Sequence, residues 1–290
     1  MKKIIILLPV YNDWESLLKL LDEIDLVIKN IKSFKFECII INDSSTAEKT
    51  IIKKPKSLNS LKIINMRQNR GHARCNAFGL RYINLNEAYD YVIIMDSDGE
   101  DRPIEIGNLT DKISKDPETS VVAKRIKRSE GPIFQTLYRA HKLITFIFTG
   151  KKINFGNYTC LTRNDVNYLS DKPSLWSSFS GSVKKHIKSL NEVDSIRGKR
   201  YFGPSKMSLF NLGIHSFSII GVFKYIVFLR STFMILVLAF FTKPLGSIAV
   251  TLQILIVIFN LLIFLVSQRE NESDLHESGK NILNEDKITH

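Results

Sequence analysis

The N-terminal two thirds of the chain alternates short apolar runs with segments of helical spacing. Mostly apolar runs cover residues 4–10, 37–41, 61–65 and 91–95. Runs of this kind, without strict polar alternation, are typical of strands that are buried on both faces of a sheet. Between them, residues 14–31 and 71–82 place apolar side chains on one helical face. This order predicts an α/β domain over residues 1–208, with a mostly parallel sheet flanked by helices.

Long apolar stretches replace this pattern towards the C-terminus. Residues 247–266 carry no charged side chain, and a helix of that length reaches about 30 Å, the thickness of a bilayer's hydrocarbon core. Residues 225–241 form a second apolar stretch in which Arg230 is the one charged residue. The short connector contains Pro244 and Gly246, which favour a tight turn. The pattern therefore predicts two transmembrane helices, joined as a hairpin, over residues 225–266.

The first apolar stretch also permits another arrangement. An arginine in the middle of a membrane is costly, so residues 209–230 are alternatively a juxtamembrane helix that lies at the interface. The turn of the hairpin holds one basic residue, Lys243, whereas the segment before the hairpin holds five: Arg197, Lys199, Arg200, Lys206 and Lys224. This bias places the large domain in the cytosol. The polar segment 267–290 is predicted to be a disordered tail.

Charge and cysteine content restrict the partners. The net charge is +12, which favours an anionic partner such as nucleic acid, a phosphorylated substrate or a membrane surface. The basic run at residues 124–128 lacks interleaved aromatic residues, so we expect no nucleic acid. Cys38, Cys75 and Cys160 are far apart and are interpreted as reduced thiols of a cytosolic domain. The composition leaves homo-oligomerisation open.

Polar residues follow three of the predicted strands, at residues 9–13, 42–45 and 96–101. Because the carboxyl ends of parallel strands meet at one edge of a sheet, we expect these segments to lie together. Asp96 and Asp98 are alternate residues directly after a buried strand, so their carboxylates can share one side. Such oxygen ligands suit Mg²⁺ or Mn²⁺. The alternative is an ordinary solvated acidic loop.

The order and spacing of these segments resemble glycosyltransferase family 2, whose members have the GT-A (Rossmann-like) fold. The apolar hairpin is similar to that of the polyprenol-phosphate sugar synthases, such as dolichol-phosphate mannose synthase and undecaprenyl-phosphate glucosyltransferases. The resemblance rests on residues 9–13 (PVYND), 42–45 (NDSS), 69–79 (NRGHARCNAFG), 96–106 (DSDGEDRPIEI), 121–125 (VVAKR), Arg197 and 203–206 (GPSK).

The resemblance implies a role for each matching residue. The residues implied to border the donor nucleotide are Pro9, Tyr11, Asp13, Asp43 and Asp96. The residues implied to hold the metal on its diphosphate are Asp96, Asp98 and Glu100. The residues implied to act in catalysis are Asp98, Arg125, Arg197 and Lys206, of which the basic three would face the phosphates. His72 is expected near the phosphates as the first residue of a helix, without a catalytic role.

The implied reaction is an inverting, metal-dependent transfer of a sugar from a nucleotide-diphosphate sugar to a polyprenyl (undecaprenyl or dolichyl) phosphate. This activity would belong to an integral protein of a membrane, by expectation the bacterial inner membrane. One alternative is transfer to a hydroxyl of a lipid-linked or surface polysaccharide, with a base among Asp101, Asp165, Asp171, Glu192 and Asp194. Another is a non-catalytic, membrane-tethered protein that binds nucleotide sugars. The chain departs from the family pattern at Asp13, Asn42, Glu100, Arg102 and Gly156-Asn157-Tyr158.

Overall fold

The computed structural model describes residues 1–127, 132–204 and 208–289. In this part of the chain, eight strands form one sheet in the order β7-β5-β6-β4-β1-β2-β3-β8. The strands are β1 Lys2–Val10, β2 Phe34–Asn42, β3 Ser60–Met66, β4 Tyr91–Ile94, β5 Val121–Lys127, β6 Phe155–Thr162, β7 Asn191–Ile196 and β8 Ile282–Ile288.

The sheet is mixed. Strand β1 pairs in parallel with β2 and β4, β2 pairs in parallel with β3, and β5 pairs in parallel with β7. Strand β6 runs antiparallel to both β4 and β5, and β8 runs antiparallel to β3. The predicted α/β class is confirmed, and the apolar runs at 4–10, 37–41, 61–65 and 91–95 correspond to β1, β2, β3 and β4.

Helices cover both faces of the sheet, which explains why β1 is apolar without alternation. Ile4, Ile6 and Leu8 pack with the core beneath α1 and α3, whereas Ile5 and Leu7 pack with the core beneath α2 and the short helices α5 to α7. These helices are α1 Trp14–Ile28, α2 His72–Asn86, α3 Ile106–Lys115, α5 Arg163–Leu169, α6 Pro173–Ser177 and α7 Phe179–His186. A single turn of 3₁₀ helix, η1 Pro103–Glu105, precedes α3.

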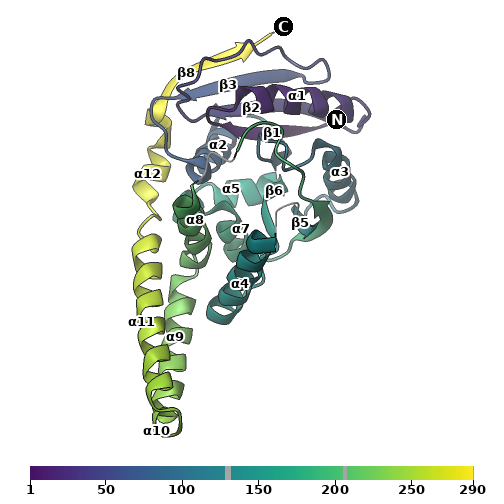
Figure 1. The fold of residues 1–290 in the computed structure, drawn as a ribbon. Coiled ribbons are helices and arrows are strands. Elements are labelled where there is room, and N and C mark those ends of the chain that lie inside the picture. The colour runs from purple at the N-terminus through teal and green to yellow at the C-terminus, as the bar shows by residue number, and fades with distance from the viewer. Residues whose placement is uncertain (128–131, 205–207, 290) are drawn as a thin grey trace.

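A helical hairpin extends away from the domain (Figure 1). It consists of α9 Lys224–Phe240, the short α10 Thr242–Leu245 and α11 Ser247–Ser267. The apolar helix that begins at Ser247 is long enough to cross a membrane. The preceding helix, α8 Leu209–Gly221, is bent by 84° relative to α9, and the two satisfy the same criterion as a bent pair.

The bend divides residues 209–230, predicted as a juxtamembrane or interfacial region, between two helices. The break falls at residues 222–223, so Arg230 belongs to the hairpin helix α9. Two local features explain the break. Gly221 ends α8, and the carbonyl oxygen of Val222 accepts a hydrogen bond of 2.8 Å from Lys185 Nζ on α7. A lysine that captures a terminal carbonyl satisfies an acceptor that a continuing helix would otherwise use.

The segment 267–290 was predicted to be disordered, and this prediction is wrong for the described residues up to 289. The chain returns along the domain as α12 Glu272–His276 and η2 Ser278–Asn281, and then adds β8 to the sheet. Leu275 is completely buried. Asn65 on β3 donates a 2.6 Å hydrogen bond to Asn284 on β8. A composition-based prediction fails because the open edge of β3 supplies main-chain partners that the polar segment alone does not reveal.

Candidate active site

The ends of β1, β2 and β4 meet at one edge of the sheet, as predicted. Val10 lies opposite Asn42 in the register of β1 and β2. The N–H of Asp43 donates to the carbonyl oxygen of Val10 at 2.9 Å. The hydroxyl of Ser97 donates to the carbonyl oxygen of Pro9 at 2.6 Å. These bonds fix the three polar segments against one another and place the acids 96–101 beside the end of β1.

Asp96 is the centre of a network of short contacts. Its Oδ1 lies 3.1 Å from His72 Nε2 and accepts a 3.0 Å hydrogen bond from Asn157 Nδ2. Its main-chain N–H donates to Asp101 Oδ2 at 3.0 Å. Burial disfavours a charge here, but the charge of His72 and the hydrogen bonds from His72 and Asn157 outweigh it and hold the pKa of Asp96 well below its usual range. Asp96 is therefore ionised at neutral pH.

Asp98 is paired with Arg200. The Oδ2 of Asp98 lies 2.8 Å from Arg200 Nη1, and its Oδ1 accepts a 3.0 Å hydrogen bond from the N–H of Glu100. The same Arg200 guanidinium also contacts Asp13, the residue directly before α1. Burial and the nearby charge of Asp96 raise the pKa of Asp98. One arginine thus bridges two of the acids that the sequence assigned to the donor site.

The bend at Gly99 requires glycine. Its φ is +89°, and an added Cβ would lie 2.5 Å from the ring of Tyr201. Tyr201 belongs to the segment that follows β7, and its ring packs against the turn between Asp98 and Glu100. The N–H of Tyr201 donates to the carbonyl oxygen of Asp98 at 2.9 Å.

Two more arginines complete the basic side of the cluster. Arg197 pairs with Glu100, and Arg125 lies 3.8 Å from Asp101. Burial and the charge of Asp96 raise the pKa of Asp101 to about 7. The guanidinium of Arg125 lies directly on Gly156, where a side chain would occupy its space. The site thus alternates acids and cations and brings together the predicted residues Asp13, Asp96, Asp98, Glu100, Arg125 and Arg197.

The predicted metal ligands are only partly supported by this geometry. Asp96 and Asp98 come from one short segment, remain partly accessible and present the carboxylate oxygens that Mg²⁺ or Mn²⁺ prefers, so they fit a divalent cation. Glu100 is held by Arg197 as Asp98 is held by Arg200, so both carboxylates would have to leave an arginine to bind the cation. Across residues 1–127, 132–204 and 208–289, no three His, Cys, Asp or Glu side chains converge as a metal group.

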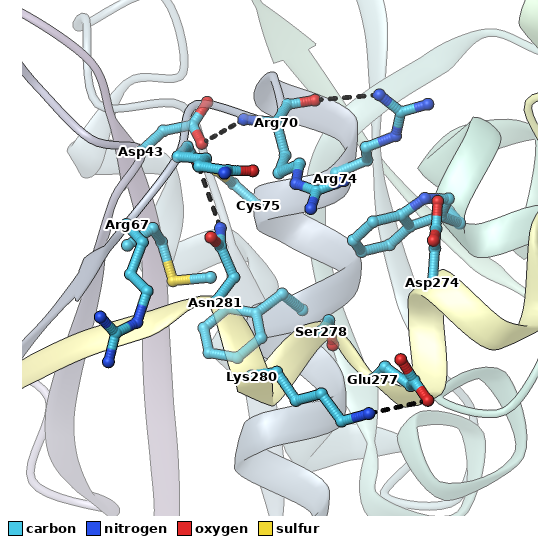
Figure 2. Close-up of a pocket in the computed structure, with 14 residues that line it drawn as sticks. Asp43, Arg67, Arg70, Arg74, Cys75, Asp274, Glu277, Ser278, Lys280 and Asn281 are labelled. Atoms are coloured by element: carbon cyan, nitrogen blue, oxygen red, sulfur yellow. Dashed lines mark hydrogen bonds and ion pairs between the residues drawn. The ribbon is translucent and has the colours of Figure 1, made fainter.

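Asp43 fixes the loop before α2 and also lines a pocket beside it. Its two carboxylate oxygens accept hydrogen bonds of 2.8 Å from the N–H groups of Arg70 and Gly71, and so hold the loop before α2. Behind this loop lies a pocket of about 290 Å³ that the C-terminal segment helps to enclose (Figure 2). Its lining includes Arg67, Arg74 and Asp274. Tyr11 is exposed at the end of β1, and Lys206 lies outside the described residues.

Three participants were not recognised as such from the sequence. Arg200 was counted only as part of the basic segment before the hairpin, and its pairing with Asp13 joins residues that are 187 positions apart. Asn157 was noted only as a departure from the family pattern, although it donates to Asp96. His72 was expected as the first residue of a helix, which it is, and it also contacts Asp96 directly. Its position at the start of α2 was the available signal, because that helix end faces the acid cluster.

Comparisons with known proteins agree with this architecture. The chain is 25% identical over 225 residues to the undecaprenyl-phosphate 4-deoxy-4-formamido-L-arabinose transferase of Photorhabdus laumondii, covering 73% of this chain and 65% of that protein. The enzyme of the same name from Serratia proteamaculans is 24% identical over 227 residues, covering 73% and 64%. The chain therefore spans just under two thirds of the length of these relatives.

Solved structures show the same GT-A-like fold. Glucosyl-3-phosphoglycerate synthase from Mycobacterium tuberculosis, in complex with Mn²⁺, UDP-glucose and phosphoglyceric acid, superimposes with a TM-score of 0.52 and 16% identity, covering 78% of this chain and 80% of that one. Mannosyl-3-phosphoglycerate synthase from Rubrobacter xylanophilus gives 0.53 and 13%, covering 76% and 72%. The family model "Glycosyl transferase family 2" matches residues 5–176, more than half of the chain. The protein therefore belongs to glycosyl transferase family 2.

Proposed function

We propose that the protein transfers a sugar, with inversion, from a nucleotide-diphosphate sugar to a polyprenyl phosphate at the cytosolic face of a membrane, with Mg²⁺ or Mn²⁺ as cofactor. The position of α8 carries this proposal. This helix leads into the apolar hairpin, and its His215 lies within electrostatic range of His72, Asp96 and Arg125. A site at the base of the hairpin is where an acceptor held in a membrane can be reached.

The relatives support the choice of substrates. The two similar transferases are named for undecaprenyl phosphate as acceptor, and one structural neighbour holds Mn²⁺ with UDP-glucose. The basic flank of the hairpin favours a cytosolic domain, where nucleotide sugars are available. The net charge of +12 over the whole chain suits phosphorylated substrates.

The residues of the chain have defined tasks in this proposal. Asp96 and Asp98 would hold the cation, which when bound neutralises charge on the departing diphosphate. Arg197 and Arg200 are already desolvated beside the acids, and we expect them to re-pair with phosphate oxygens when the donor enters. A phosphate acceptor is ionised near neutral pH, so its attack on the sugar's anomeric carbon needs no strong base.

Product formation by the full chain in nanodiscs tests the proposal. We expect undecaprenyl phosphate and a common nucleotide sugar to give a glycolipid that mild acid cleaves, and we expect EDTA to abolish its formation until Mn²⁺ or Mg²⁺ is restored. Asp98→Asn should lower the rate roughly 100-fold or more. The matched variant Asp111→Asn changes an exposed acid on α3 and should leave the rate unchanged. If no donor gives a metal-dependent glycolipid, the proposal is refuted.

A hydroxyl acceptor is the second candidate, and Asp101 favours it. Transfer to a hydroxyl needs a general base, and a carboxyl group whose pKa is raised to about 7 is suited to that task near neutral pH. The product distinguishes the two candidates, because a glycosidic bond to a sugar hydroxyl survives the mild acid that cleaves a glycosyl phosphate. Asp101→Asn should abolish only the hydroxyl transfer.

A further inference from the structure

Helix α4 Pro132–Thr149 has an inverted distribution of polar and apolar side chains in its last turns. Thr145 and Thr149 face the protein and are 3% and 2% exposed, and each hydroxyl donates to a carbonyl one turn earlier in the helix. The outward face instead carries four exposed apolar residues, here called the outer face of α4: Leu143, Ile144, Phe146 and Ile147. A helix surrounded by water would bury these residues and expose the threonines.

The C-terminal end of α4 is joined to the hairpin. Arg230 Nη1 on α9 donates a 3.0 Å hydrogen bond to the carbonyl oxygen of Ile147, and its guanidinium lies against Gly150. The ring of Phe148 packs on the ring of Phe259 on α11, with 4.2 Å between centroids. Figure 1 shows α4 projecting from the domain at the same end as the hairpin.

These contacts set the depth of α4 relative to the hairpin. Arg230 lies six residues into α9, which corresponds to about 9 Å along the helix axis. Phe259 lies eight residues before the end of α11, which corresponds to about 12 Å. Two independent contacts therefore place the end of α4 roughly 10 Å beyond the domain-side ends of the hairpin helices. If the hairpin crosses a bilayer, this depth lies within the leaflet on the domain side.

Two carbonyl groups in the last turn of α4 have partners within the protein. Free carbonyl groups at a helix end are normally satisfied by water. Here Arg230 serves the carbonyl of Ile147, the N–H of Gly150 donates to Phe146, and the N–H of Lys151 donates to the hydroxyl of Thr149. A cation at a helix C-terminus also interacts favourably with the helix dipole. Arg230, whose charge would be costly in a membrane, is thus hydrogen-bonded to the end of α4.

We propose that the outer face of α4 is embedded among lipid acyl chains of the leaflet next to the domain, so that the catalytic domain is held to the membrane by a third apolar helix besides the hairpin. A basic residue borders this face, since the Lys152 ammonium lies over the ring of Phe146, as in a side chain that extends its charge away from an apolar surface. The inference rests on the hairpin crossing the bilayer and is independent of which sugar or acceptor is used.

Site-directed quenching in vesicles of the full chain tests this placement. The native cysteines are all buried, so a cysteine introduced at position 143 can be labelled selectively with an environment-sensitive fluorophore. The matched controls are Leu26→Cys on α1 and Leu261→Cys on α11. The three leucines are similarly exposed, at 59%, 67% and 57%. Helix α1, which carries position 26, lies at the end of the domain away from the hairpin, and position 261 on α11 reports on the hairpin itself (Figure 1).

We expect a nitroxide attached to the acyl chain to quench labels at positions 143 and 261 several-fold more than the label at position 26, and aqueous iodide to do the reverse. A label at position 143 that iodide reaches as readily as position 26 would overturn the proposal. So would a label shielded from both quenchers, which would indicate that a second protein copy covers the face. If position 261 is not quenched by lipid, the premise of a spanning hairpin fails as well. Ile147→Cys repeats the measurement one turn further along.

Discussion

Replacing Leu275 by alanine measures how firmly the C-terminal segment is docked on the domain. Leu275 lies in α12, is 0% exposed, and packs in the core on the α2 side of the sheet. The substitution removes buried carbons and leaves a cavity that the surrounding helices can fill only in part. Such changes cost about 2–5 kcal/mol, and for a leucine without any exposure we expect about 3 kcal/mol. In a domain of this size that lowers the apparent melting temperature by about 6–12 °C.

The assay is thermal unfolding of the detergent-solubilised full chain, followed by circular dichroism. Leu283→Ala is the matched control, because Leu283 follows in β8, is 55% exposed and should change stability by less than about 0.5 kcal/mol. Hydrogen exchange adds a local readout, since the amides of β3 should exchange faster in Leu275→Ala if loosening of α12 frees β8. Equal melting temperatures for the two variants would refute the docking of the segment, because a disordered tail tolerates both substitutions.

Three further outcomes follow from the structure. Burial and two neighbouring lysines lower the pKa of His186 to about 4, so the unfolded state takes up its proton first and stability falls as pH drops from about 6.5 towards 4. Because this side chain is partly accessible to solvent, we expect the free energy of unfolding to fall by only about 1–2 kcal/mol over this range. Urea titration at both pH values measures the loss, which should be absent in His186→Gln. Gly79→Ala brings a Cβ to 2.5 Å from the fully buried Leu7 and should cost about 1–3 kcal/mol by the same titration. Gly99→Ala should lower turnover more than it lowers the melting temperature, since it strains the turn between the acids at φ +89° by about 1–3 kcal/mol; an unchanged rate would contradict this.

Periodicity predicted the elements of the domain because their driving force is local. The buried run at residues 4–10 and the helical spacing of residues 14–31 reflect burial against neighbours on known faces, and both appear as β1 and α1. The meeting of the polar segments at one edge was also predictable, since it follows from parallel pairing alone. Pairings between distant side chains were not predictable. The contact of Arg200 with Asp13 depends on where the chain goes after β7, and no sequence period encodes that.

The C-terminal segment and α4 escaped prediction for a related reason. When each segment is considered alone, only its composition is available for a prediction. The contacts that determine its structure come from other parts of the fold. The polar β8 is ordered by the open edge of β3. The apolar residues of α4 face outward because Arg230 and Phe259 fix the helix against the hairpin. In each case a partner far away in sequence reverses what composition indicates.

The departures from the family pattern bear on whether the site is intact. Loss of function by drift would leave altered residues without partners, because nothing would select a compensating contact. Here the altered positions are each engaged: Asp13 with Arg200, Glu100 with Arg197, and Asn157 with Asp96. A buried polar group without a partner costs about 1–3 kcal/mol, so this mutual pairing is what a maintained site requires. It also explains how five acids coexist at one sheet edge before any cation arrives. The arginines and His72 neutralise them in advance, and those same guanidinium groups become available for phosphate when a divalent cation takes over the acids.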